Sequence, residues 1–315
     1  MRLVFAGTPA AAIPTLQALL ASQHEVVAVV TQPPAPAGRG RTLKQSEVHD
    51  FALANNLEVF TPESINSEES LTFLASLNAD LAVVVAYGQL LKLETLDVLP
   101  RGWINLHFSL LPQFRGAAPV QRAIMTGEQI TGASVFQLDA GMDTGPVYGT
   151  CTVEIASTDT TDSLLPRIAE VGAGLVVACV DGLETGQLVA KPQSVDDVSL
   201  APKISVAETN IKWNHPALGI DRWIRGATSE PGAWTTCEGQ RIGIGPLELA
   251  DSGATLQPGE LLIAKNEVLV GTGSSPVRLG QVKPAGKGWM QAADWARGLR
   301  TQPTFEYVNG DDESR

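Results

Sequence analysis

The chain has 315 residues, 44% of them hydrophobic and 18% charged, a composition typical of a globular protein with one large or two moderate cores. Its three cysteines and four histidines are scattered, which excludes a disulfide framework and argues against a protein zinc site. A net charge of −12 argues against nucleic-acid binding through the field of the whole protein, so any such contact must come from local basic clusters.

The first predicted elements alternate between strands and helices. Strand patterns at residues 2–6 and 25–30 enclose a helical segment at 10–22, which predicts a parallel sheet with a right-handed crossover. Gly7 is the only glycine before Gly38, so the GxGxxG fingerprint is absent and NAD is not expected. There is no export signal pattern and no run of about 18 apolar residues. We therefore expect a cytoplasmic protein without a membrane partner.

Residues 31–44 are too rich in proline and glycine for a helix or a central strand, so we expect an irregular surface loop. Arg39, Arg41 and Lys44 place three positive charges within six residues of an otherwise acidic part of the chain. The cluster fits either a solvated loop or a contact with an anionic partner.

Two apolar runs predict buried strands, one at residues 81–86 and one at residues 103–106. Asn105 and His107 lie at the end of the second, and ligands bind at the carboxyl ends of strands in open α/β sheets. Taken alone, the two side chains are better explained as partners of backbone groups at a strand end.

A second loop favours a catalytic role for Asn105 and His107 over a purely structural one. Residues 138–146 form a glycine-rich loop with two carboxylates after a strand pattern at 133–137. Asn105, His107 and Asp143 on adjacent loops can act together on a carbonyl group. The amide and the imidazole would stabilise an oxyanion, and the carboxylate would set the protonation state of the imidazole.

The pattern changes near Val189. A long helix is predicted for residues 161–184, whereas residues 191–212 show little periodicity and predict an interdomain linker. Beyond Pro231, short apolar runs alternate with glycine and proline, which is typical of a small β-barrel or sandwich. We therefore expect an α/β fold with a Rossmann-like, mostly parallel sheet in residues 1–190, followed by a small β-domain in residues 213–315.

Four blocks closely resemble the 10-formyltetrahydrofolate-dependent formyltransferases. They are Asn-x-His at 105–107, Ser-Leu-Leu-Pro at 109–112, Arg-Gly-Ala-Ala-Pro at 115–119 and Asp-x-Gly-x-Asp-Thr-Gly at 139–145. The resemblance covers nearly the whole chain, from residue 5 to residue 287. Within the family, the chain is most similar to members that formylate methionine on initiator tRNA.

The resemblance implies that a formyl group moves from 10-formyltetrahydrofolate, consumed as a co-substrate, to the α-amine of initiator methionyl-tRNA for translation initiation. It implies catalytic roles for Asn105, His107 and Asp143 and requires no metal. It also implies an OB-like, tRNA-binding barrel at the C-terminus and a folate-binding first domain. The folate pocket would be lined by Ser109, Leu110, Leu111, Pro112, Gln89 and Leu91, although Leu91 fits an ordinary core position equally well.

For tRNA, the resemblance points to the loop with Arg39, Arg41 and Lys44, and Lys283 and Lys287 are further candidates for phosphate contacts. Single lysines are more often simply solvated. Three residues depart from the family pattern and leave fine folate or tRNA contacts open: Phe108, Gln113 and Phe114.

Two other functions remain open at this point. A formyltransferase for a small amine, such as a nucleotide amino-sugar, would share Asn105, His107 and Asp143. A non-catalytic RNA-binding relative would keep the fold without the activity. The sequence leaves the oligomeric state open.

Overall fold

The computed structural model describes residues 1–37, 42–250, 253–299 and 303–307. The chain forms two compact units. The first contains Met1–Pro119, Ile130–Glu154 and Leu165–Ala201, and the second contains Val120–Gln129, Ile155–Leu164 and Pro202–Arg315.

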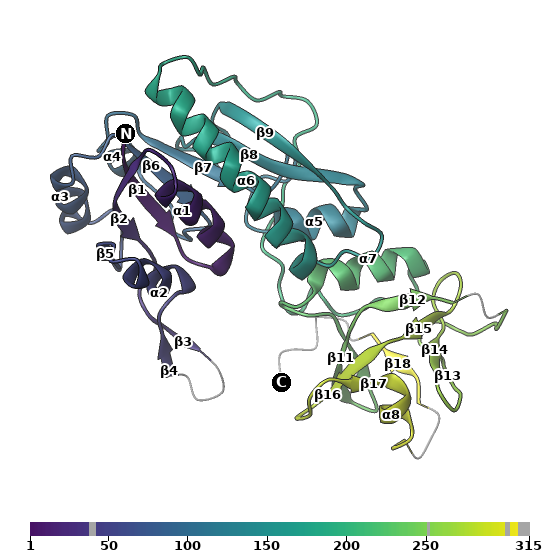
Figure 1. The fold of residues 1–315 in the computed structure, drawn as a ribbon. Coiled ribbons are helices and arrows are strands. Elements are labelled where there is room, and N and C mark those ends of the chain that lie inside the picture. The colour runs from purple at the N-terminus through teal and green to yellow at the C-terminus, as the bar shows by residue number, and fades with distance from the viewer. Residues whose placement is uncertain (38–41, 251–252, 300–302, 308–315) are drawn as a thin grey trace. The chain divides into compact units, whose positions relative to one another are not determined.

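A seven-stranded sheet forms the centre of the first unit (Figure 1). In chain order its strands are β1 (Arg2–Gly7), β2 (Glu25–Val30), β5 (Val59–Phe60), β6 (Leu81–Val85), β7 (Trp103–His107), β8 (Ile130–Gln137) and β9 (Val147–Glu154). In space the order is β5-β2-β1-β6-β7-β8-β9. The first five are parallel to one another, β8 is antiparallel to β7, and β9 is antiparallel to β8. The predicted α/β fold with a mostly parallel sheet is confirmed.

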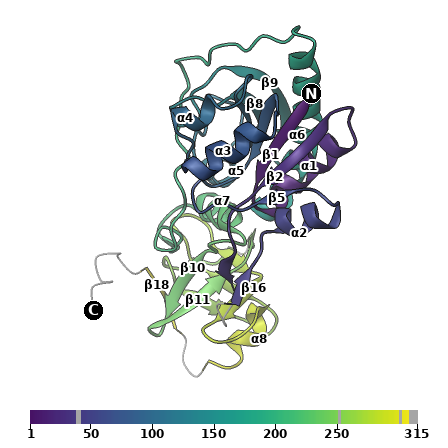
Figure 2. The same ribbon diagram turned by 90° about the vertical axis from the view of Figure 1, so that its left-hand side faces the viewer.

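Helices cover both faces of this sheet. They are η1 (Ala10–Ala12), α1 (Ile13–Leu20), α2 (Glu47–Ala54), α3 (Glu68–Ser76), α4 (Leu93–Leu96) and α6 (Thr161–Glu184), whose residues from Leu165 onward belong to this unit. On one face, Leu74 of α3 and Leu96 of α4 pack in one core cluster with Val4, Ala82 and Trp103 of the strands. Figure 2 views the molecule with α3 and α4 toward the reader.

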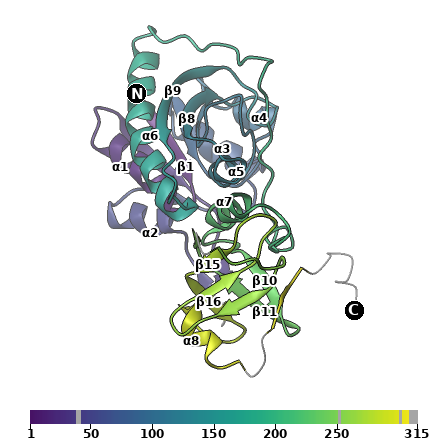
Figure 3. The same cartoon turned by 90° about the vertical axis from the view of Figure 1, so that its right-hand side faces the viewer.

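The opposite face is covered by α6, which lies along β9 in Figure 3. A Cβ atom at Gly172 of this helix would meet the Leu106 side chain at 3.0 Å, so the absence of a side chain allows helix and sheet to approach closely. α6 has 24 residues, and an 18-residue window within it has a mean hydropathy of 1.6, so by length and composition alone it could cross a membrane. Part of this helix is nevertheless buried as in a core helix, with Ile168, Ala169 and Val176 inaccessible to solvent and Gly172 against Leu106 of β7 and Ala133 of β8.

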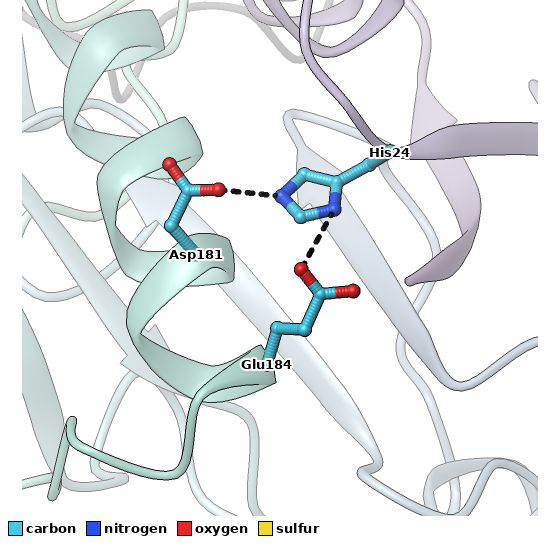
Figure 4. Close-up of side chains that lie close together, drawn as sticks. All are labelled: His24, Asp181 and Glu184. Atoms are coloured by element: carbon cyan, nitrogen blue, oxygen red, sulfur yellow. Dashed lines mark hydrogen bonds and ion pairs between the residues drawn. The ribbon is translucent and has the colours of Figure 1, made fainter.

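His24 joins the start of β2 to the end of α6 (Figure 4). Its buried imidazole has Nε2 at 3.1 Å from Asp181 and Nδ1 at 3.9 Å from Glu184. Gln23 donates to Asp181 at 2.9 Å, and the amine of Met1 contacts Glu184 at 2.5 Å. The ligand atoms of His24, Asp181 and Glu184 lie within 4.8 Å of one another, as metal ligands would. Nδ1 lies closer to the amine of Met1, at 3.1 Å, than to Glu184, so both imidazole nitrogens have hydrogen-bond partners within the chain and the cluster is explained as a hydrogen-bond network that joins the N-terminus, His24 and α6.

The expected irregular loop at residues 31–44 contains a small hairpin. β3 (Ala35–Ala37) pairs antiparallel with β4 (Thr42–Lys44), so the prediction that proline and glycine prevent regular structure here is wrong. A two-stranded ladder has an outer edge where a proline nitrogen needs no hydrogen-bond partner, and Pro36 is therefore tolerated. Arg39 and Arg41 lie outside the described residues.

The second unit contains two antiparallel sheets. The first has the order β17-β16-β11-β10-β18 and consists of β10 (Trp234–Cys237), β11 (Gln240–Ile244), β16 (Gln281–Pro284), β17 (Met290–Gln291) and β18 (Phe305–Glu306). The second has the order β12-β15-β14-β13 and consists of β12 (Leu247–Leu249), β13 (Leu261–Ile263), β14 (Val268–Val270) and β15 (Val277–Leu279). The prediction of a small β-domain after the α/β domain is confirmed, and its sheets are wholly antiparallel.

Helices complete the second unit. α7 (Ala217–Ala227) and α8 (Ala292–Ala296) contribute Ile224 and Ala296 to a core shared with Val270 and Phe305. The earlier segments of the chain are tied to α7 by hydrogen bonds. Thr161 donates its hydroxyl to the carbonyl of Gly226 at 2.7 Å, and Arg225 donates to the carbonyl of Asp159 at 2.7 Å. A further helix, α5 (Pro119–Thr126), lies almost wholly in this unit.

Part of the segment predicted as a linker belongs to the first unit, which extends to Ala201. Lys191 and Val147 exchange backbone hydrogen bonds of 2.7 and 2.8 Å, and Ala201 donates to the carbonyl of Arg115 at 2.7 Å. Residues 191–201 thus form a strap held on the same unit as the predicted catalytic residues. We call this segment the strap.

Candidate active site

Asn105 and His107 are presented by β7, between β6 and β8. Asn105 pairs with Val84 on one side and with Phe136 on the other, so its backbone position is fixed by both neighbours. Its side chain is half-buried, and among the described residues its amide has no hydrogen-bond partner. The backbone of Asn105 is therefore fixed, and its side-chain amide remains available as a donor to a ligand.

The imidazole of His107 is buried and is held by a hydrogen bond at Nε2. Nε2 lies 2.8 Å from the carbonyl oxygen of Phe114, which can only accept, so Nε2 carries a hydrogen. Nδ1 lies 3.7 Å from Oδ2 of Asp143. Burial lowers the pKa of His107 below its ordinary value, and the Asp143 carboxylate and the Phe114 carbonyl oppose that shift. Because burial dominates, the neutral ring, with a lone pair on Nδ1, is favoured more than in water.

Asp143 is placed by a strained backbone and one strong hydrogen bond. Its φ is +53°, a conformation that non-glycine residues rarely adopt. Its Oδ2 accepts the backbone N–H of Gly116 at 2.8 Å. Gly116 has a φ of +123°, and a Cβ atom there would lie 2.7 Å from the carbonyl oxygen of Ala201. Only glycine permits this close approach, so the Asp143 hydrogen bond depends on Gly116.

The loop after His107 is stabilised by its own hydroxyl groups. Ser109 is fully buried and donates to the carbonyl of Gln113 at 2.6 Å. Ser134 donates to the carbonyl of Ser109 at 2.7 Å and accepts the N–H of Leu111 at 3.0 Å. The Ser109 hydroxyl is thus already used within the loop, whereas Leu110, Leu111 and Pro112 remain partly exposed.

The segment after β6 shows the same contrast between buried polar groups and exposed apolar ones. The Gln89 side chain accepts the N–H of Ile65 at 2.8 Å and donates to the carbonyl of Pro62 at 3.2 Å, so it shapes the loop. Leu91 packs partly buried against the sheet core. Leu90, which sequence reasoning did not select, is 86% exposed. If this segment contacts a ligand, it therefore offers backbone groups and Leu90 more readily than the Gln89 amide.

The basic residues predicted to contact tRNA are on the surface where they are described. Lys44 forms an ion pair with Glu47 at 2.9 Å, which compensates part of its charge. In the second unit, Lys283 and Lys287 are exposed, and Nζ of Lys283 lies 5.9 Å from the centre of the Trp289 ring.

Gln193, in the strap, was not predicted. Its side chain accepts hydrogen bonds from Arg115 and donates to the carbonyls of Asp143 and Gly145 at 2.7 and 2.8 Å. Arg115 and Gln193 also line a pocket of about 450 Å³ together with Thr144 and Val195. Gln193 lies 50 residues from Asp143 in a stretch without periodicity, so no local signal could have revealed this contact.

The structure therefore brings Asn105, His107 and Asp143 to one edge of the sheet. An uncommitted amide donor lies two residues from an imidazole whose Nδ1 faces a carboxylate. An uncharged donor beside a group that can take up a proton is the arrangement that acyl transfer to an amine requires.

Comparisons with known proteins agree with this geometry. Residues 1–180 match the formyl transferase family, and residues 203–300 match the formyl transferase C-terminal domain. A methionyl-tRNA formyltransferase of Salinispora tropica is 51% identical over 300 residues, which are 95% of this chain and 97% of that protein. A methionyl-tRNA formyltransferase of Mycobacteroides abscessus is 53% identical over the same shares of the two chains.

The crystal structure of HypX from Aquifex aeolicus in complex with tetrahydrofolic acid aligns with a TM-score of 0.66 at 17% identity. The alignment covers 98% of this chain and 51% of that one, so this chain spans about half of that HypX and the likeness concerns the fold. The two family matches and the two relatives of equal length decide the classification: this chain belongs to the formyl transferase family, beside the methionyl-tRNA formyltransferases.

Proposed function

We propose that the chain transfers the formyl group of 10-formyltetrahydrofolate to the α-amine of methionine on initiator tRNA, in the cytoplasm. The observation that carries the proposal is the open Asn105 amide beside the His107–Asp143 pair, in a chain more than half identical to methionyl-tRNA formyltransferases over nearly its full length.

Asn105 is assigned to the formyl oxygen. Attack of an amine on the formyl carbon places negative charge on that oxygen, and an amide N–H stabilises it without titrating. The two neighbouring strands hold the Asn105 backbone in register, so little reorganisation is needed when the charge develops. The absence of a partner for the side chain among the described residues supports this role.

His107 and Asp143 are assigned to the proton of the attacking amine. With Nε2–H bound to the Phe114 carbonyl, a neutral His107 has its lone pair on Nδ1, on the side of Asp143. That nitrogen can accept the proton that the amine loses as the new C–N bond forms. Asp143 then stabilises the resulting imidazolium. When the bond between the formyl carbon and N10 breaks, the imidazolium can return this proton to N10, so tetrahydrofolate leaves as a neutral amine and His107 is neutral again. The buried ring favours the neutral, proton-accepting form before attack.

The co-substrate 10-formyltetrahydrofolate supplies an activated formyl group on N10. The residues present fit it, because the site offers an unpartnered amide donor and half-exposed apolar side chains in place of a charged pocket. We assign its binding to Leu110, Leu111, Pro112 and Leu91 as apolar contacts. Ser109 is fully buried and supports its loop without an exposed atom for folate, whereas Gln89 shapes the other loop with its side chain and can contact folate through its backbone.

Initiator methionyl-tRNA is assigned to two basic regions. One consists of Arg39, Arg41 and Lys44 in the first unit, and the other of Lys283 and Lys287 in the second. Each phosphate contact adds affinity that falls as the salt concentration rises.

The test is formyl transfer from 10-formyltetrahydrofolate to charged initiator tRNA by the purified chain. Elongator methionyl-tRNA and free methionine serve as control acceptors. Formylation of the initiator alone supports the proposal. Formylation of a nucleotide amino-sugar in place of tRNA would contradict it, as would tRNA binding without turnover.

A further inference from the structure

The outer face of the five-stranded sheet in the second unit carries an exposed aromatic ring between two lysines. Lys283 of β16 pairs with Gly243 of β11, while its neighbour Val282 is fully buried. Because side chains alternate along a strand, Lys283 points to the outer face. Trp289 precedes β17 on the adjacent side of β16, and its ring extends back over the sheet.

Two glycines allow this ring to lie against the sheet. A Cβ atom at Gly243 or at Gly245 would lie 3.6 Å from the Trp289 ring, in direct contact with it. Side chains larger than a methyl group at these positions would lift the indole off the strand. Trp289 is nevertheless 50% exposed, so one part of the ring contacts the sheet and the rest faces solvent.

The charges around Trp289 are positive and without carboxylate partners. Nζ of Lys283 lies 5.9 Å from the ring centre, and Lys287 lies in the turn that leads to Trp289. Within the described part of the chain, no carboxylate forms an ion pair with either lysine. Arg278 in the same unit contrasts with this, because it is paired with Glu248 at 2.8 Å and with a second glutamate at 2.9 Å.

We propose that an unpaired base of the tRNA stacks on Trp289 while Lys283 and Lys287 contact its flanking phosphates. Every base has a π-face, so an exposed indole beside lysines binds unpaired RNA nucleotides whatever their sequence. The inference rests on the proposed function and adds a specific stacking residue to it. The protein as a whole is acidic, yet this surface combines the exposed ring of Trp289 with two lysines, Lys283 and Lys287, whose charges are not neutralised by carboxylates in the described part of the chain. Such a surface fits RNA.

The test compares Trp289→Leu with Trp289→Phe in steady-state formylation of initiator methionyl-tRNA. Loss of one stacked base should raise the KM for tRNA by about 5- to 150-fold in the leucine variant, with kcat and the KM for folate unchanged. The phenylalanine variant keeps a π-face and should recover most of the affinity. Lys283→Ala should flatten the salt dependence of KM.

Lys265→Ala is the matched control, because this lysine is exposed in the same unit but lies in the turn between β13 and β14 of the other sheet. It should leave the KM for tRNA unchanged. If the wild-type chain formylates tRNA and Trp289→Leu has a normal KM, the stacking site is wrong and the proposed function stands. If the wild type formylates no tRNA, the function itself fails first.

A second inference comes independently from Gln193. Its Oε1 accepts from Nε and Nη2 of Arg115 at 3.1 and 2.6 Å, and its Nε2 donates to the carbonyls of Asp143 and Gly145. All four hydrogen bonds involve one amide, and both carbonyls belong to the loop that carries Asp143. We infer that Gln193 is a positioning residue, which holds Asp143 at its positive φ and so fixes the carboxylate opposite His107.

Two substitutions test the carbonyl oxygen and the N–H groups of the Gln193 side chain. Gln193→Glu keeps an oxygen for Arg115 but removes the N–H groups and places a negative charge beside two carbonyls. Gln193→Met keeps the volume and removes both ends. Each should lower kcat at least tenfold while leaving the KM for tRNA nearly unchanged. Each should also move the acid limb of the pH profile to lower pH, because a displaced Asp143 no longer supports protonation of His107.

A residue that only supports folding would lower the melting temperature without moving the acid limb. Circular dichroism and thermal melting of each variant report its folded state. Formyl transfer by the wild type is measured beside the variants. If the wild type is inactive, the proposed function fails, and only an active wild type allows the role of Gln193 to be judged. A normal kcat and an unmoved acid limb in Gln193→Glu would overturn the inference.

Discussion

Nε2 of His107 lies 2.8 Å from the carbonyl oxygen of Phe114. This one contact decides the tautomer of the ring, since a carbonyl accepts and cannot donate. The nitrogen left for chemistry is therefore Nδ1, and the sequence-based expectation that His107 stabilises an oxyanion is replaced by the proposal that its neutral ring accepts a proton. Phe114 serves here through its backbone, so its departure from the family's usual side chain leaves this contact intact.

Removal of the three proposed catalytic side chains should stop turnover without unfolding the protein. Asn105→Ala should lower kcat by about 100- to 1,000-fold, the usual loss for one oxyanion donor. His107→Ala and Asp143→Ala should each lower kcat as well. Single-turnover formyl transfer measures these losses. Asn55→Ala, which removes an exposed amide at the end of α2, is the control and should be fully active. Near-normal turnover in all three variants would refute the site.

The acid limb of the pH profile should report His107. Because burial lowers the pKa of His107, the neutral base persists below the ordinary value of 6.5 and activity should be retained to lower pH than for an exposed histidine. Asp143 raises that pKa, so Asp143→Asn should shift the limb further down while lowering kcat. Both pH profiles are measured with the same methionyl-tRNA, so the protonation of its α-amine affects them equally and does not contribute to the difference between them. An upward shift in Asp143→Asn would contradict the assignment.

A tetrahydrofolate derivative should stabilise the chain against heat, and NAD should not. A ligand that binds only the folded state at a concentration of 100 times its Kd adds about 2.7 kcal/mol to the free energy of unfolding. Thermal melting with increasing ligand measures this. The Asn105→Ala variant should melt like the wild type without ligand. Stabilisation by NAD with none by folate would overturn the co-substrate assignment.

Replacing Arg39 and Arg41 by alanine should weaken tRNA binding and leave folate binding unchanged. Removing one phosphate contact should reduce the slope of log affinity against log salt by roughly 0.7 to 0.9. Titration of initiator methionyl-tRNA at several salt concentrations measures both quantities. Lys44→Ala should have a smaller effect, because Glu47 already compensates its charge. An unchanged slope in the double variant would return these residues to a purely solvated role.

The His24 network should contribute to stability and not to metal binding. His24→Ala leaves Asp181 without its buried partner and should lower the free energy of unfolding by about 1–3 kcal/mol, measured by urea denaturation. Addition of Zn²⁺ should not raise the melting temperature of the wild type. A zinc-dependent rise that is absent from His24→Ala would show a metal site at this cluster.

The parts of the fold that follow from local patterns could be read from the sequence. The run of apolar residues from Leu81 to Val85 is a strand buried on both faces, and the predicted helix at residues 161–184 has those bounds. Asn105, His107 and Asp143 could be selected because ligands gather at strand ends. The role of Gln193 could not, since it depends on partners 50 and 78 residues away.

The hairpin of β3 and β4 was missed for a different reason. Proline and glycine argue against strands in the middle of a sheet, but among the residues that the structure describes this ladder has two strands, and no third strand pairs with either of them. The hydrogen bond of the Ser109 hydroxyl could not be predicted either, because its acceptor, the carbonyl of Gln113, comes close only when the loop turns back on itself.

The second unit is assembled from three separate stretches of chain, so its contacts can form only in the order in which these stretches are translated. Thr161 leaves the ribosome well before Gly226, the acceptor of its hydroxyl, which lies 65 residues later. At ~5–20 residues per second, the earlier stretch waits roughly 3 to 13 seconds for its partner. Met125, which packs on Gly226, waits longer still. A chain released before α7 exists would keep these residues exposed and become a substrate for chaperones and proteases.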